Sequence, residues 1–158
     1  MDMSAEDALA ILDRLEAAGL SAWVDGGWAI DAVVGDQTRP HDDLDLVVRL
    51  AEVPEIEREL AALGYERAGG SPPCSFESVD AAGRQVDVHP IAEDGAYRLR
   101  EGGVWHYPLA GLAGRGAIGG RAVRCLDVET QLYCRSGYDP VDPEKHRRDL
   151  ALLESLRP

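Results

Sequence analysis

The stretch from Val24 to Val48, VDGGWAIDAVVGDQTRPHDDLDLVV, constrains the fold more than any other part of the chain. A short apolar strand ends at its first residue, and two glycines then predict a sharp turn. One or two helical turns are predicted over 29–34, and a polar loop leads from them into a strand over 43–48. The rest of the chain must fit around this order of strand, glycine turn, short helix and acidic strand.

The second strand carries two acidic residues two positions apart. Successive side chains of a strand point to opposite faces, so Asp43 and Asp45 share one face while Leu44 and Leu46 point into the core. Two adjacent carboxylates repel each other, and ionised groups near a protein interior need pairing or metal coordination. Hard oxygen ligands suit Mg²⁺, which proteins usually hold through one or two carboxylates and substrate phosphates. We therefore predict that Asp43 and Asp45 bind metal.

The glycine turn predicts the other half of a site. Gly26 and Gly27 let the backbone approach a ligand closely, and the helix that follows presents free N–H groups and a positive dipole end. Such a turn can hold a phosphate. A phosphate cradle followed by a strand with paired carboxylates is the layout of a metal-dependent phosphoryl or nucleotidyl transfer site.

The same motifs carry a family resemblance. Gly-Gly-Trp at 26–28, Ile-Asp at 30–31 and Arg-Pro-His-x-Asp-x-Asp at 39–45 together resemble the small antibiotic nucleotidyltransferases of the DNA polymerase β superfamily. The superfamily usually has Gly-Ser at the turn, whereas this chain has Gly-Gly, as that antibiotic branch does. The lincosamide and aminoglycoside 2''-nucleotidyltransferases are the most similar members. The resemblance implies a polymerase β-type nucleotidyltransferase fold.

Composition excludes several classes of function. A net charge of −13 argues against general nucleic-acid binding, which needs a basic face, and suits a cationic small-molecule partner. No apolar run approaches the roughly 20 residues of a membrane span. The opening MDMSAEDALA lacks the basic region and apolar core of a signal peptide. We therefore expect a cytoplasmic protein that binds neither nucleic acid nor membrane.

Helical and strand patterns alternate along the rest of the chain. Helices are predicted over 4–19, 51–63, 127–136 and 144–156, and strands over 65–70, 74–79, 84–91, 97–100, 104–107 and 121–126. The glycine-rich stretch before the last strand lacks a P-loop and is predicted to form loops and a hairpin. This order indicates an α+β (mixed α/β) fold in which helices flank a mixed sheet. We expect one domain over residues 1–158, with a catalytic core over 1–91 and C-terminal strands and helices over 92–158.

The strand over 84–91 contributes a third candidate metal ligand. Val86 and Val88 face the core, while Asp87 and His89 share the opposite face. If this strand lies beside the acidic strand, Asp87 completes a carboxylate triad, as a site that holds two metal ions requires. By resemblance, Asp87 is either a metal ligand or the general base toward an acceptor hydroxyl. His89 can equally be a structural residue or part of the site.

The last predicted helix holds Lys145, the single lysine among 16 basic residues. A lysine retained against such a bias suggests a compact point charge for phosphate. The segment from Gly137 to Asp149 resembles the C-terminal pattern of the same antibiotic-modifying enzymes. That resemblance implies that Lys145 or His146 contacts the triphosphate. Three leucines of this helix are predicted to pack inward: Leu150, Leu153 and Leu156.

Three polar residues between the glycine turn and the acidic strand have open roles. Asp31 could hydrogen-bond Arg39 and brace the loop, or Arg39 could instead reach a phosphate. His41 could orient the loop or a neighbouring carboxylate.

These features lead to the hypothesis of a nucleotidyltransferase that uses ATP or another nucleoside triphosphate and two Mg²⁺ ions. It would move a nucleoside monophosphate to a hydroxyl group of a small molecule such as an aminoglycoside or a lincosamide antibiotic. The compact lincosamide enzymes form pairs, so the resemblance also implies a homodimer. A nucleotidyltransferase that modifies a protein, as in toxin–antitoxin systems, and a non-catalytic nucleotide-binding module remain as alternatives.

Overall fold

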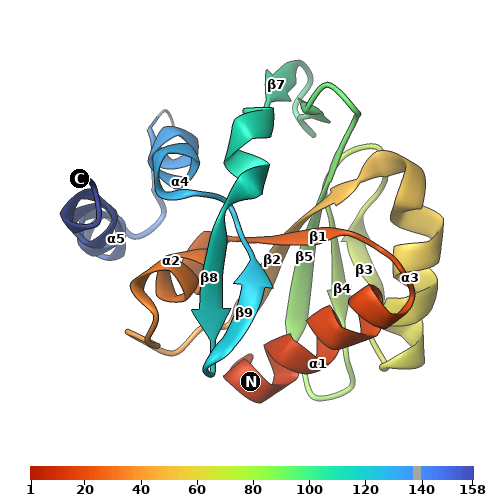
Figure 1. Cartoon of the computed structure of the whole chain (residues 1–158). Coiled ribbons are helices and arrows are strands. Elements are labelled where there is room, and N and C mark those ends of the chain that lie inside the picture. Colours follow the sequence, from red (N-terminus) through yellow and green to blue (C-terminus); the bar gives the residue numbers. More distant parts are fainter. Residues whose placement is uncertain (137–139) are drawn as a thin grey trace.

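The structure, a computed structural model, describes residues 1–136 and 140–158. The helices are α1 (Ala5–Ala17), α2 (Gly26–Val34), α3 (Val53–Ala62), α4 (Val128–Arg135) and α5 (Pro143–Ser155), with 3₁₀ turns at Leu50–Glu52 and Leu109–Ala113. The strands are β1 (Ala22–Asp25), β2 (Asp43–Arg49), β3 (Glu66–Gly70), β4 (Phe76–Val79), β5 (Gln85–Ile91), β6 (Ala96–Arg98), β7 (Val104–His106), β8 (Arg115–Ile118) and β9 (Arg121–Arg124). Figure 1 shows this arrangement.

A five-stranded sheet in the order β1-β2-β5-β4-β3 forms the centre of the molecule. The β2 and β5 strands run parallel, whereas the other neighbouring pairs in this sheet are antiparallel. The mixed sheet with flanking helices confirms the α+β prediction. Two separate hairpins, β6-β7 and β8-β9, follow the sheet in the chain.

The two faces of the sheet differ in character because each strand alternates. One face carries Leu44, Leu46, Val86 and Val88, which are buried in a large core cluster with residues from α1, α2 and α3. The opposite face carries the carboxylates of β2 and β5 at one end. At the other end of that face, Val47 belongs to a second cluster that includes Trp23, Ile91, Tyr107 and Leu126. The carboxylates therefore lie on strands whose other residues are packed in two hydrophobic clusters.

Helix starts follow the capping residues in the sequence. Ser4 makes a capping box with Asp7, and Asp127 and Asp142 accept backbone N–H bonds at the starts of α4 and α5. The α2 helix differs from the prediction, since it begins at Gly26 rather than after Trp28. Asp25 is its N-cap, so both glycines belong to its first turn.

The C-terminal half confirms the predicted hairpin and corrects one expectation about α5. The glycine-rich stretch contains a 3₁₀ turn and the strand β8, which pairs with β9. On α5, Leu153 is buried, but Leu156 is exposed because it lies at the C-cap. Asp149 is buried instead, since arginines from two other segments surround its carboxylate. Gly137 and Tyr138, which belong to the resemblance above, lie outside the described residues.

The α4 and α5 helices stand beside α2, on the far side from α1 and α3 (Figure 1). This packing brings residues near the C-terminus to the start of α2. In the described part of the chain, no helix is long and apolar enough to cross a membrane.

Candidate active site

Three carboxylates meet at the ends of β2 and β5. The parallel register places Asp45 directly opposite Asp87, and Asp43 lies two residues earlier on β2. One oxygen from each of Asp43, Asp45 and Asp87 lies within 4.8 Å of the others, which is the one such cluster in the described structure. The predicted triad is therefore assembled in space.

The electrostatics of this cluster show that its negative charges are not balanced from within. Burial, together with the charges of Asp45 and Asp87, raises the pKa of Asp43 to about 8. Burial and the Asp45 charge likewise raise the pKa of Asp87, although hydrogen bonds from its neighbours oppose the shift. A bound divalent cation would remove this repulsion, and a set of hard oxygen donors suits such an ion. The residues present therefore fit a divalent metal.

The first turn of α2 lies directly against the triad. A Cβ atom added at Gly26, where φ is +64°, would collide with the Asp45 carboxylate. A Cβ atom at Gly27 would lie 2.5 Å from Nδ1 of His41 and 2.8 Å from Nη2 of Arg39. Only glycine leaves room at both positions, because side chains from the neighbouring strand and loop occupy the space.

Basic residues gather on the other side of the same cleft, which has a volume of about 390 Å³. Its lining includes eight of the residues singled out in the sequence: Gly26, Gly27, Arg39, His41, Asp43, Asp45, Lys145 and His146. The Lys145 charge lies near enough to Asp43 to oppose the rise in its pKa. One side of the cleft is thus acidic and the other basic, which is the arrangement that a metal-bound polyphosphate requires.

The loop between α2 and β2 corrects one expectation about Asp31. Its carboxylate bonds Nε2 of His41 at 2.5 Å and accepts from the Thr38 hydroxyl at 2.6 Å, so its partner is His41 rather than Arg39. Burial alone would raise the pKa of Asp31, but these hydrogen bonds outweigh burial and hold it below its usual range. Arg39 bonds His41 from the other side of the ring.

His89 joins the triad to an aromatic cluster. Its Nε2 atom lies 3.2 Å from Oδ1 of Asp45, and its Nδ1 atom lies 3.2 Å from the Tyr97 hydroxyl. Burial would lower the pKa of His89, but the hydrogen bond and charge of Asp45 raise it to about 10. His89 therefore contacts one carboxylate of the triad directly, and its raised pKa favours the protonated ring.

No role at the site was predicted for three residues near the cleft. Asp25 lies opposite Asp45 in the β1-β2 register, caps α2, and has a pKa that burial raises. Arg135 from α4 lines the cleft, and Asp149 from α5 lies between Arg135 and Arg39. Asp25 could have been noticed as the residue before the glycines. Arg135 carries no sequence signal, since it approaches only through helix packing, whereas Asp149 ends the segment that carries the C-terminal resemblance.

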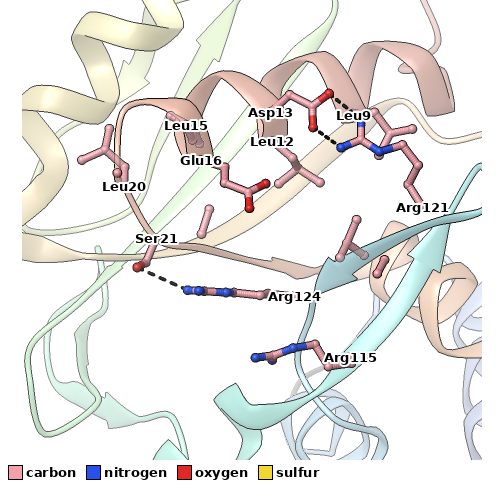
Figure 2. Close-up of a pocket in the computed structure, with 14 residues that line it drawn as sticks. Leu9, Leu12, Asp13, Leu15, Glu16, Leu20, Ser21, Arg115, Arg121 and Arg124 are labelled. Atoms are coloured by element: carbon pink, nitrogen blue, oxygen red, sulfur yellow. Dashed lines mark hydrogen bonds and ion pairs between the residues drawn. The ribbon is translucent and has the colours of Figure 1, made fainter.

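A second cleft of about 440 Å³ lies away from the triad, between α1 and the β8-β9 hairpin. Figure 2 shows that two of its arginines are already engaged: Arg121 binds Asp13 and Arg124 reaches Ser21. None of the site residues predicted from the sequence lines it.

Residues 7–153 match the aminoglycoside-2''-adenylyltransferase family. The chain belongs to this family. It is 34% identical over 142 residues to a 2''-aminoglycoside nucleotidyltransferase of Klebsiella pneumoniae, covering 86% of this chain and 77% of that protein. It is 28% identical over 150 residues to a lincosamide resistance protein of Staphylococcus haemolyticus, covering 92% and 91% of the two chains. This protein is therefore an enzyme of the antibiotic nucleotidyltransferase family.

Comparison with solved structures agrees with this family assignment. The lincomycin-bound lincosamide antibiotic adenylyltransferase LnuA superposes with a TM-score of 0.83 at 27% identity, covering 99% of this chain and all of its own. The enzyme ANT(2'')-Ia in complex with adenylyl-2''-tobramycin superposes with a TM-score of 0.77 at 30% identity, covering 96% and 87%. The nucleotidyltransferase fold expected from the glycine turn and acidic strand is thus confirmed.

Proposed function

We propose that this protein transfers AMP from ATP to a hydroxyl group of an aminoglycoside or lincosamide antibiotic, with Mg²⁺ as the metal. The observation that supports this most strongly is the close approach of Asp43, Asp45 and Asp87, whose oxygens lie within 4.8 Å of one another. These carboxylates would hold the metal. A divalent ion there would neutralise phosphate charge and stabilise the attacking and leaving oxygens.

The residues on the basic side of the cleft would bind the nucleotide. The N–H groups of Gly26 and Gly27 lie at the start of α2, where the helix dipole favours an anion. Arg39, Lys145 and His146 line the same cleft and would contact the phosphates. The α-phosphorus would then lie between these groups and the carboxylates.

The acceptor would approach along the carboxylate face. Its hydroxyl oxygen would form a bond to the α-phosphorus, while the bond from that phosphorus to pyrophosphate breaks. The hydroxyl proton would pass to a carboxylate, and Asp87 would take this role where it does not itself bind the metal, because it lies directly opposite Asp45 on the neighbouring strand.

The acceptor class follows from two kinds of support. The relatives named above act on aminoglycosides and lincosamides, and a net charge of −13 suits a cationic drug. By resemblance to the compact lincosamide enzymes, we also propose a homodimer, whose mass light scattering would measure.

The test is transfer of label from α-labelled ATP, in the presence of Mg²⁺, to single aminoglycosides and lincosamides, with pyrophosphate release followed in parallel. A labelled drug with equimolar pyrophosphate is the expected result, and the drug that carries the label names the acceptor. Binding of Mg·ATP without transfer to any drug would refute the antibiotic as acceptor. Absence of Mg·ATP binding would refute the nucleotidyl transfer itself.

A further inference from the structure

A chain of buried polar groups lies beneath the basic side of the cleft. Asp31 and His41 are each 2% exposed, and Nε2 of His41 lies 2.5 Å from Oδ2 of Asp31. On the other side of the ring, Nδ1 of His41 lies 2.9 Å from Nη1 of Arg39. The imidazole therefore connects a buried carboxylate to a guanidinium that lines the cleft.

The chemistry of these groups fixes the direction of both hydrogen bonds. A guanidinium nitrogen can only donate, so Nδ1 of His41 must be an acceptor without a proton. The ring proton then lies on Nε2 and is donated to Asp31. A second proton on Nδ1 would place two donors against each other, so the neutral Nε2–H tautomer is the one that this geometry allows.

Asp31 and His41 are each held in place by further contacts. The Thr38 hydroxyl bonds the other oxygen of Asp31 at 2.6 Å. The His41 ring packs against Trp28 with 4.6 Å between ring centroids, and the His41 carbonyl accepts from the Met3 N–H at 2.8 Å. The ring can therefore neither turn nor slide without breaking several contacts.

Arg39 is held from two sides. Its Nη1 atom faces His41, and its Nη2 atom lies 3.4 Å from Oδ2 of Asp149. Nη2 also lies 2.8 Å from the position that a Cβ atom on Gly27 would take. The guanidinium is thus fixed directly beside the first turn of α2.

We propose that Asp31 and His41 are positioning residues that hold the Arg39 guanidinium at the start of α2, ready to receive the polyphosphate of the nucleotide. This inference rests on the proposed function, because it takes the nucleotide to bind there. An arginine side chain is long and flexible, so a free Arg39 would lose conformational freedom on each binding event. Holding it in advance removes that loss and improves nucleotide affinity.

The first test is the tautomer of His41, measured by nitrogen-resolved NMR of the full chain without ligand. The Phe variant His41→Phe assigns the signal among the four histidines. A proton on Nε2 and none on Nδ1 is expected. A proton on Nδ1 would overturn the inference, since Arg39 could not then donate to that atom. This measurement does not depend on any catalytic activity.

The second test is a double-mutant cycle on Mg·ATP affinity by calorimetry. His41→Phe keeps the ring against Trp28 but removes both hydrogen bonds, so the Kd is expected to rise roughly tenfold. His41→Gln, which retains a donor and an acceptor, is expected to recover most of that loss. In an Arg39→Ala background, His41→Phe should add almost nothing, because residues that act through one another are non-additive.

Controls separate failure of this inference from failure of the proposed function. Arg121→Ala and His106→Phe remove exposed side chains outside the cleft and should leave the Kd unchanged. If Lys145→Ala weakens Mg·ATP binding while the Arg39 and His41 variants do not, the positioning role is wrong and the nucleotide site stands. If none of these variants affects binding, the assignment of the nucleotide site is wrong. Full additivity of His41→Phe with Arg39→Ala would also overturn the inference.

Discussion

Two clefts of similar volume, about 390 Å³ at the carboxylates and about 440 Å³ between α1 and the β8-β9 hairpin, differ sharply in how their charges are balanced. In the second cleft, both oxygens of Asp13 bind Arg121, which holds the pKa of that carboxyl below its usual range (Figure 2). In the first, three carboxylates face one another and the pKa of Asp43 is raised to about 8. Unbalanced charge, rather than volume, therefore distinguishes the candidate ligand-binding cleft from the other cleft.

The largest expected difference between the two clefts is the effect on the transfer rate when one carboxylate is removed from each. We expect Asp45→Asn to lower the rate of transfer by roughly a thousandfold or more, because a metal-binding site would lose a charged ligand. The matched change in the other cleft, Asp13→Asn, should leave the rate within about twofold. The measurement is kcat with saturating ATP and drug, alongside circular dichroism to show that both variants are folded. Equal effects of the two changes on kcat would contradict the assignment of catalysis to the cleft with the carboxylate triad.

Two glycines with similar backbone angles allow a finer comparison. Gly26 has a φ of +64° and Gly19 a φ of +75°, so alanine strains both positions. The space around Gly19 is open, whereas alanine at Gly26 would displace the Asp45 carboxylate. We expect Gly26→Ala to lower kcat roughly a hundredfold, with Gly19→Ala changing only the melting temperature. A normal kcat for Gly26→Ala would mean that the Asp45 position is not critical.

The basic side of the cleft should affect nucleotide binding rather than chemistry. We expect Lys145→Ala to raise the KM for ATP roughly tenfold while kcat changes much less, since a phosphate contact made throughout the reaction binds ground and transition states alike. Lys145→Arg should recover part of the affinity. Initial rates over a range of ATP concentrations measure both constants. A fall in kcat with an unchanged KM would contradict this role.

The smallest expected effect concerns stability without metal. The Asp43 carboxyl ionises near 3.8 when unfolded but near pH 8 when folded, so ionisation favours the unfolded chain between these values. Its contribution to stability is present at low pH and is lost as the pH rises toward 8. Asp43→Asn should therefore stabilise the metal-free protein at pH 8 by about 1 kcal/mol, or roughly 2–4 °C. The gain should be smaller at pH 5, because the pH is then only a little above the pKa of the unfolded carboxyl.

Thermal unfolding in the presence of a chelator, at pH 5 and pH 8, measures this difference. Asp13→Asn is the control, because the pKa of Asp13 is lowered rather than raised and its removal should give no gain at pH 8. Added Mg²⁺ should raise the melting temperature of the natural protein but not that of Asp43→Asn. A melting temperature that is equal for both proteins at pH 8 would show that the carboxylate repulsion is relieved in another way.

Much of the fold was predictable because its signals are local. The caps at Ser4, Asp127 and Asp142 fix three helix starts, and the alternation of Asp43 to Val48 fixes which side of β2 is buried. The start of α2 was misplaced, since a glycine pair is a weak helix former in isolation. Here the cap at Asp25 outweighs that preference.

The sequence alone determined which residues could hold metal and phosphate, because D-x-D spacing on a strand and a glycine pair before a helix impose their geometry within a few residues. The tertiary structure alone decided what surrounds them. Parallel pairing of β2 with β5 places Asp87 opposite Asp45, and packing of α4 and α5 on α2 brings in Arg135 and Asp149. These contacts join residues up to 110 positions apart, and no local pattern encodes which of many distant charges will become neighbours.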